Sequence, residues 1–364
     1  LEDEVEDDRR QSLDFYEDDF FETETNLLRF GVSQDLDDTS TISADYARRD
    51  TEREFIQTFR PFPGSLNTQE RDSGLFNVSY RSAPVDAGAL SSYLVGFTRE
   101  DTDYELVSVF GPQAIDQLIQ DVFRSTQWAF GERNQVDVGV RYSDLDADIA
   151  GDDFDDTVTA FGLGYSRAFE SFRLFARADQ NFRYPTVEEH TNVPFGEEPG
   201  LETQEGVSIE LGLEYRGARN RVRGTVYRID LDNEIGFDSS SANINIDSTQ
   251  RYGMILEAGR DWTDSIETRL SFTALDAEIS DGEFEDNQLP LVPERSLRLD
   301  GIYRYSDATL LGLELIAVGE QVLGGDFANQ LDKLDAYNVL NLHASYNRGD
   351  WVLGFRINNL ADEE

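Results

Sequence analysis

The clearest pattern in the chain is an alternation of apolar and polar residues over residues 339–360. The apolar positions are Leu340, Leu342, Ala344 and Tyr346 before a turn at 347–350, and Trp351, Leu353, Phe355 and Ile357 after it. A period of two places the two sets on opposite faces of a strand, so the segment predicts a hairpin with one apolar and one polar face. Whether the apolar face contacts a protein core or lipid decides the fold class.

The same alternation recurs along most of the chain, whereas helical periodicity is scarce. It predicts strands near 22–33, 40–50, 72–82, 89–99, 116–129, 135–144, 157–167, 172–179, 205–215, 221–231, 249–259, 265–277, 293–304, 309–320, 335–346 and 351–359. The stretch 112–122 fits either a helix or a strand. Because neighbouring strands follow one another closely, we expect a single antiparallel, meandering sheet.

Short and long connections alternate between these strands. The short ones lie at 168–171, 216–220, 305–308 and 347–350, and the long ones at 145–156, 180–204, 232–248, 278–292 and 321–334. Short turns at one end and long loops at the other are typical of a transmembrane β-barrel. Trp128, Trp262 and Trp351 all adjoin expected short turns, so we interpret them as a membrane-interface girdle at one rim.

The two faces of the expected sheet differ in what they can contact. The polar face carries Arg, Asp, Glu, Asn and Gly, which a packed core would not accept. No helices are expected to cover the apolar face, and closing the sheet in lipid satisfies every backbone group. We therefore predict an all-β, antiparallel transmembrane β-barrel, with a soluble two-sheet protein as the alternative.

The chain is strongly acidic, with 74 Asp and Glu against 31 Lys and Arg and a net charge of −43. A nucleic-acid partner is therefore not expected, because binding phosphates requires a basic surface. Acidic runs lie at 2–8, 17–19, 144–156 and 281–286. We interpret them as a solvated surface. Divalent cations that bridge to lipopolysaccharide phosphates are the alternative, since hard ions bind carboxylate oxygens.

Few residues could support catalysis or metal binding. The chain has no Cys and only His190 and His343. We therefore expect neither an enzyme nor a cofactor, and the sequence leaves a metal site undetermined. His343 shares the polar face of its strand with Asn341 and Ser345, so we interpret it as lumen-facing and structural. No apolar run of about 18 residues is long enough for a membrane-spanning helix, and residues 1–6 do not resemble a signal peptide.

Residues 182–362 contain an ordered series of short motifs. They are FRYPT at 182–186 followed by Glu188, LET at 201–203 followed by IELGLEY at 209–215, VYRIDLDNEI at 226–235, RYGMILE at 251–257, LPLVP at 289–293, YNVLNL at 337–342 and INNLAD at 357–362. In order and spacing the series resembles the C-terminal part of the barrel of TonB-dependent outer-membrane receptors. Upstream, residues 20–180 resemble these receptors only in their overall pattern of residues and not in particular motifs.

The resemblance implies a barrel of about 22 strands with a plugged lumen. Residues 1–364 would then be a barrel fragment of about sixteen strands that lacks the plug domain, with open edges at 22–33 and 351–359. The implied function is energised uptake of a scarce large solute, most often a ferric siderophore, with cobalamin, haem or a glycan as alternatives. A passive porin is the rival class.

The resemblance also implies the partners and the location. The partners are the TonB energy-transducing complex, contacted through the plug, and the lipid and lipopolysaccharide of a Gram-negative outer membrane. Solute-binding residues are expected in the outer loops. The candidates are Arg60, Phe62, Phe110, Tyr184, Glu188, Glu189 and His190.

Overall fold

The computed structural model describes residue 16 and residues 18–59, 62–83, 88–109, 111–190, 201–238 and 242–361. The strands are β1 (Phe20–Asp37), β2 (Ser40–Phe59), β3 (Phe62–Ser82), β4 (Leu90–Ser108), β5 (Gly111–Phe130), β6 (Asn134–Ile149), β7 (Asp152–Ala168), β8 (Phe172–Arg183), β9 (Gln204–Arg216), β10 (Asn220–Phe237), β11 (Asn243–Asp261), β12 (Ile266–Asp281), β13 (Arg295–Ser306), β14 (Thr309–Val318), β15 (Tyr337–Arg348) and β16 (Trp351–Ile357). The short 3-10 helix η2 (Val187–His190) follows β8.

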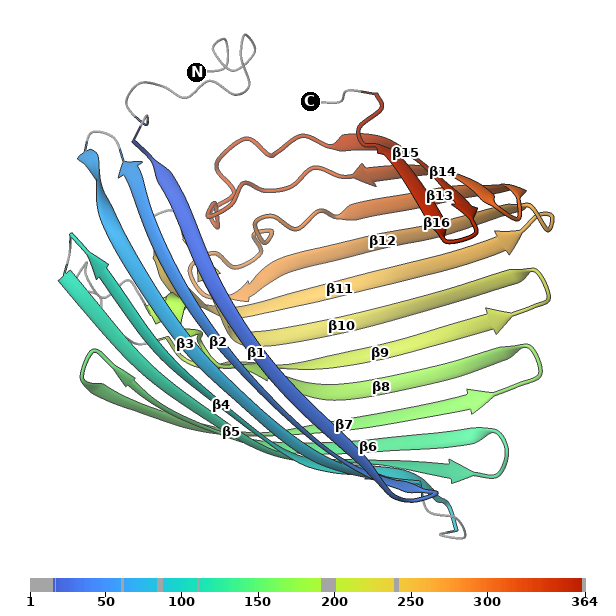
Figure 1. The fold of residues 1–364 in the computed structure, drawn as a ribbon, viewed down its shortest axis with the longest axis horizontal. Coiled ribbons are helices and arrows are strands. Elements are labelled where there is room, and N and C mark those ends of the chain that lie inside the picture. The colour runs from blue at the N-terminus through green and yellow to red at the C-terminus, as the bar shows by residue number, and fades with distance from the viewer. Residues whose placement is uncertain are drawn as a thin grey trace.

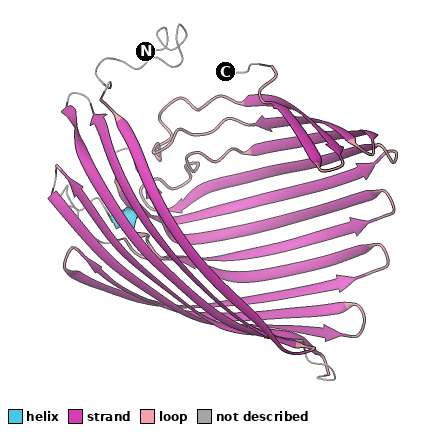
Figure 2. Ribbon diagram, viewed as in Figure 1, coloured by secondary structure: helices cyan, strands magenta, loops and turns pink. Residues whose placement is uncertain are grey.

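These strands form one curved antiparallel sheet of 16 strands in sequence order, from β1 to β16 (Figures 1 and 2). Each strand pairs with its neighbours in the chain, so the described part of the sheet has β1 and β16 as its edges. The sheet is not closed. This confirms the all-β prediction, the meander and the two open edges, and it is the form expected of a partial barrel.

An apolar band covers the outer surface of the sheet. On β7 its members are Phe161 and Leu163, which are 58% and 56% exposed, and on β9 they are Ile209 and Leu211, at 54% and 58%. An exposed apolar surface that extends over many strands is the lipid-facing band of a membrane barrel. No helix among the described residues is long and apolar enough to span a membrane.

The two rims differ as expected from the connection lengths. Trp128 lies near the end of β5, Trp262 directly follows β11, and Trp351 begins β16. In a meander every second connection lies at the same end, so the three tryptophans share the rim of short turns. The connections between β8 and β9, β12 and β13, and β14 and β15 lie at the opposite rim (Figure 1). A membrane-interface role for the tryptophans stays a prediction.

Several strands continue well past the ends expected from the sequence. The prediction of long loops at 145–156 and 232–248 is wrong. The strands take up most of these residues, because β6 ends at Ile149, β7 begins at Asp152, and β10 reaches Phe237. On β6 the alternation persists but its polarity reverses. Leu145, Ala147 and Ile149 are buried on the inner side, whereas Asp146 and Asp148 are exposed. These strands therefore rise beyond the apolar band, where the outer face meets water instead of lipid.

Candidate functional site

The inner wall of the sheet carries charged residues in paired networks. Glu267 lies between Arg221, Arg269 and Arg304, at 3.0, 2.7 and 2.7 Å. Glu314 pairs with Arg298 and Arg356 at 2.5 and 3.1 Å and accepts a hydrogen bond from Asn341 Nδ2 at 2.8 Å. Each carboxylate is nearly buried under its arginines, which offset its desolvation. In these two networks the wall is therefore a polar surface whose charges are already paired.

Aromatic rings on the inner wall lie against glycines of the adjacent strands. The pairs are Phe123 with Gly96, Phe175 with Gly212, Tyr227 with Gly253, and His343 with Gly312. In each pair the ring occupies the space that a side chain at the glycine would fill. His343 lies opposite Gly312 on one side and Arg356 on the other, on the inner face as expected.

Towards the loop rim, the chain folds inward after β8. Glu189 fixes the start of η2, because its carboxylate accepts bonds from the Thr186 amide at 2.8 Å and from Arg183 Nη1 at 2.8 Å. Burial of this carboxyl would raise its pKa, but Arg183 and Thr186 outweigh that effect and hold the pKa below its ordinary value. The segment thus begins as a capped and charge-paired turn.

Contacts from three strands hold this inward segment, residues 184–190, in place. Glu188 accepts two bonds from Arg71 Nη1 on β3, at 2.8 and 3.1 Å. Gln117 on β5 donates to the Pro185 carbonyl oxygen at 2.9 Å, and Asn243 on β11 donates to the Glu189 carbonyl oxygen at 3.1 Å. The segment is therefore fixed across the sheet and not only to its own hairpin.

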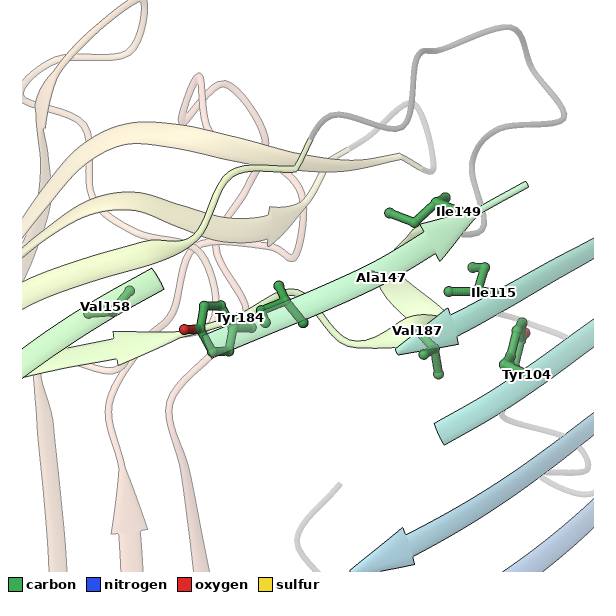
Figure 3. Close-up of a cluster of buried hydrophobic side chains, with 8 residues drawn as sticks. Tyr104, Ile115, Ala147, Ile149, Val158, Tyr184 and Val187 are labelled. Carbon is green, nitrogen blue, oxygen red and sulfur yellow. The ribbon is translucent and has the colours of Figure 1, made fainter. Parts of the chain in front are cut away.

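Beneath the inward segment, and including two of its side chains, lies a buried apolar cluster (Figure 3). Its members are Tyr104, Ile115, Leu145, Ala147, Ile149, Val158, Tyr184 and Val187. Val187 is 1% exposed and projects from η2 onto the ends of β5 and β6. Burial raises the pKa of Tyr104 to about 12, so its phenol stays neutral. Above the level of lipid, the inner face is thus a small protein core that supports the segment.

The structure brings together four of the residues expected to bind a solute. Tyr184 and His190 are 7% and 5% exposed, and Glu188 and Glu189 are ion-paired. His190 Nδ1 is buried and has no hydrogen-bond partner among the described residues. These positions shape the wall of the lumen, and their contact with a solute stays a prediction.

For the other three expected binding residues the structure describes no side chain. Arg60 and Phe110 lie outside the described residues. Phe62 begins β3, and its side chain is likewise outside the description.

Three further luminal arginines, Arg49, Arg53 and Arg71, lie on adjacent strands and were not among the predicted site residues. Arg71 is the partner of Glu188. The signal was present in the chain, because Arg53 stands between Glu52 and Glu54, and Arg71 stands between Glu70 and Asp72. Alternating charges on a strand place arginine on one face and carboxylates on the other.

The chain matches a family model and many solved structures. The model of the TonB-dependent receptor-like β-barrel matches residues 4–360. The copper transporter OprC is 16% identical, with a TM-score of 0.78 over 94% of this chain and 59% of its own. The siderophore receptor PiuA from Acinetobacter baumannii is 14% identical, with a TM-score of 0.76 over 94% and 61%.

A third structure is the ferric-catecholate import receptor Fiu from E. coli K12, which is 13% identical with a TM-score of 0.74 over 95% of this chain and 61% of its own. At these identities the likeness shows the fold. The chain spans about three fifths of the length of each of these receptors. Because the family model covers nearly all of the chain, the protein belongs to the TonB-dependent receptor-like β-barrel family.

Proposed function

We propose that the protein takes part in TonB-dependent uptake of a scarce large solute across the outer membrane, and that this solute is a ferric siderophore. The family match over residues 4–360 carries the proposal. Similar folds include an import receptor for ferric catecholate, a siderophore receptor and a copper transporter. The partners proposed with this function are the TonB complex, outer-membrane lipid and lipopolysaccharide.

The geometry supports binding at the loop rim of the lumen. The inward segment there is held by hydrogen bonds from Arg71 and Gln117, and Arg71 Nε is buried without a hydrogen-bond partner among the described residues. A large polar solute needs such a preformed surface with a few placed donors. We propose that Tyr184, Glu188, Glu189 and His190 shape this surface, and that Arg60, Phe62 and Phe110 also contact the solute.

A passive porin is the less favoured alternative. The described sheet has two unpaired edges, β1 and β16, instead of a sealed ring. Open edges do not persist in lipid, because their backbone groups would lack partners. A self-sufficient sixteen-stranded diffusion channel is therefore disfavoured for these strands.

The test uses the native gene in its own host. Deleting it should abolish uptake of radiolabelled iron from the cognate siderophore, and so should dissipating the proton motive force in cells that retain the gene. Fractionation should recover the protein with the outer membrane. Uptake that continues without the proton motive force, together with swelling of liposomes that contain the purified protein, would instead favour a porin.

A further inference from the structure

Three arginines form a compact cluster on the inner face of β2 and β3. In the pairing of these strands, Arg71 lies directly opposite Thr51, which stands midway between Arg49 and Arg53. Cβ atoms of directly opposed residues lie about 4.5–5.5 Å apart, and diagonal neighbours roughly 7–8 Å apart. Long arginine side chains at these positions can reach one ligand together. We call these three residues the arginine cluster.

The cluster faces the lumen and not the outside. Arg71 binds Glu188 of the inward segment, and its other cross-strand neighbour is Tyr104, a member of the buried cluster beneath that segment. Successive residues of a strand point to opposite faces. The neighbouring carboxylates Asp50, Glu52, Glu54, Glu70 and Asp72 therefore lie on the outer face and cannot neutralise the cluster directly.

The cluster has more cationic groups than nearby carboxylates. Arg71 pairs with Glu188 at 2.8 Å. Arg53 donates to the neutral Gln69 Oε1 at 3.3 Å. Arg49, which is exposed, makes no ion pair with the described residues. In addition, Arg71 Nε is buried and without a hydrogen-bond partner in the described part of the chain.

The surrounding luminal positions are neutral and hydroxyl-rich. On β1 to β4 the positions in register with the cluster are Thr23, Thr25, Leu27, Thr51, Gln69, Ser73, Thr102, Tyr104 and Leu106. None of them is acidic, although the chain has a net charge of −43. A local excess of positive charge in so acidic a protein favours an anion.

We propose that Arg49, Arg53 and Arg71 bind the anionic oxygens of the transported solute, so that the solute is an anionic metal chelate with carboxylate or catecholate groups. This inference rests on the proposed uptake function and narrows its substrate class. Guanidinium groups form strong, directional bonds to such oxygens. Glu188 shows this binding mode, since both of its carboxylate oxygens lie within 2.8 and 3.1 Å of Arg71 Nη1.

Glu188 provides a second, independent test of the proposal. Its carboxylate occupies Arg71, so it competes with any incoming anion for that donor. Glu188→Gln should therefore strengthen anion binding, whereas Arg49→Gln with Arg53→Gln should weaken it. A purely structural role for the same residues gives no reason for opposite effects on a ligand.

The test measures binding by titration calorimetry to the protein purified from its native membrane. The probes are iron(III)–citrate and iron(III)–tris(catecholate), which are anionic, a cationic iron(III)–trihydroxamate chelate, and citrate without metal. The double variant Arg49→Gln/Arg53→Gln is compared with Arg81→Gln. Arg81 lies on the same face of β3 at the rim of short turns and is exposed. Circular dichroism confirms that each variant is folded.

We expect an anionic probe to bind more tightly than the cationic one, with an affinity that falls as salt is added. The double variant should lose roughly tenfold for each arginine removed, about 1.4 kcal/mol apiece, and Arg81→Gln should bind like the unaltered protein. Equal binding of the anionic probes by the double variant and the unaltered protein would overturn the inference, and so would the absence of any anion binding. If the arginines govern citrate binding but cells import no chelate, the uptake function fails and the anion site stands.

Discussion

Asp103 on β4 lies directly opposite Asp116 on β5. The pair belongs to an unbroken row on the outer face that crosses six adjacent strands, Asp50, Asp72, Asp103, Asp116, Asp148 and Asp153. A second row, one step nearer the loop rim, consists of Glu24, Glu52, Glu70 and Glu105. Like charges that face each other across a pair of strands repel, so the two rows destabilise this part of the folded sheet.

The aspartate row predicts that salt stabilises the outer ends of β4 to β6. Of its members, Asp50 and Asp72 contact Arg48, which offsets part of their repulsion. Hydrogen exchange of the β4–β5 hairpin near Asp103 should slow as sodium chloride is added, because counterions screen exposed charges. Asp116→Asn should slow exchange at low salt, by roughly 0.2–1 kcal/mol of opening free energy.

The control for this experiment is Asp264→Asn at the rim of short turns. Asp264 is 97% exposed and pairs with Arg219 at 3.0 Å. Such an exposed ion pair contributes little to stability, so its removal should leave amide hydrogen exchange at the loop rim unchanged. Faster exchange of the β4–β5 hairpin at high salt would show that the row is not repulsive.

The same row predicts a pH effect centred on Asp116. Burial, together with the charges of Asp103 and Asp148, raises the pKa of Asp116 above 3.8. A carboxyl that binds its proton more tightly when folded favours the folded state below its unfolded pKa, and this contribution is lost as pH rises through the folded pKa. Local protection of the β5–β6 hairpin, measured by hydrogen exchange, should therefore increase as pH falls towards the carboxyl range. Asp116→Asn should remove this dependence, and a matching increase in the variant would contradict the assignment.

His190 predicts the opposite pH response in the inward segment. Burial lowers the pKa of His190 below 6.5, although Glu189 opposes the shift, and the Phe154 ring lies 6.5 Å from the imidazole. A histidine held neutral contributes stability above its unfolded pKa and loses it as pH falls through its folded pKa. Exchange of amides in 184–190 should thus quicken below neutral pH. The same response in His190→Gln would assign the effect to another group.

The period-two alternation was sufficient to predict the number of strands and their order, whereas the two open edges were predicted from the family resemblance, which implies a barrel of about 22 strands. The alternation did not predict where β6 ends or where β7 begins. Asp146 and Asp148 occupy outer positions that are apolar lower on the same strand, and acidic residues at such positions resemble a loop. The local sequence shows that outer positions change from apolar to acidic. This change does not end the strand, because beyond the level of lipid the outer face of the strand contacts water.

The candidate site was predictable in part. The resemblance of 182–186 to a family motif directed attention to Tyr184 and Glu188, but their inward position depends on contacts with Arg71 and Gln117. Those partners are distant in sequence, and nothing local specifies them. Arg53 was overlooked because its acidic neighbours dominate the composition of the segment, although their alternation places the charges on opposite faces.

The reversed polarity of the extended strands predicts where apolar side chains stabilise the fold most. Leu145 is 1% exposed within the cluster beneath the inward segment, whereas Leu211 is 58% exposed on the outer band. Truncating a fully buried leucine to alanine costs about 2–5 kcal/mol, because a cavity remains. Leu211→Ala leaves no enclosed cavity, since detergent or lipid fills the space.

In detergent, denaturant unfolding should show a large loss of unfolding free energy for Leu145→Ala and a much smaller one for Leu211→Ala. Exchange of amides in 184–190 should also quicken only in Leu145→Ala. Equal losses from the two substitutions would mean that the inner cluster is not a core and that the inward segment is held only by its ion pairs and hydrogen bonds.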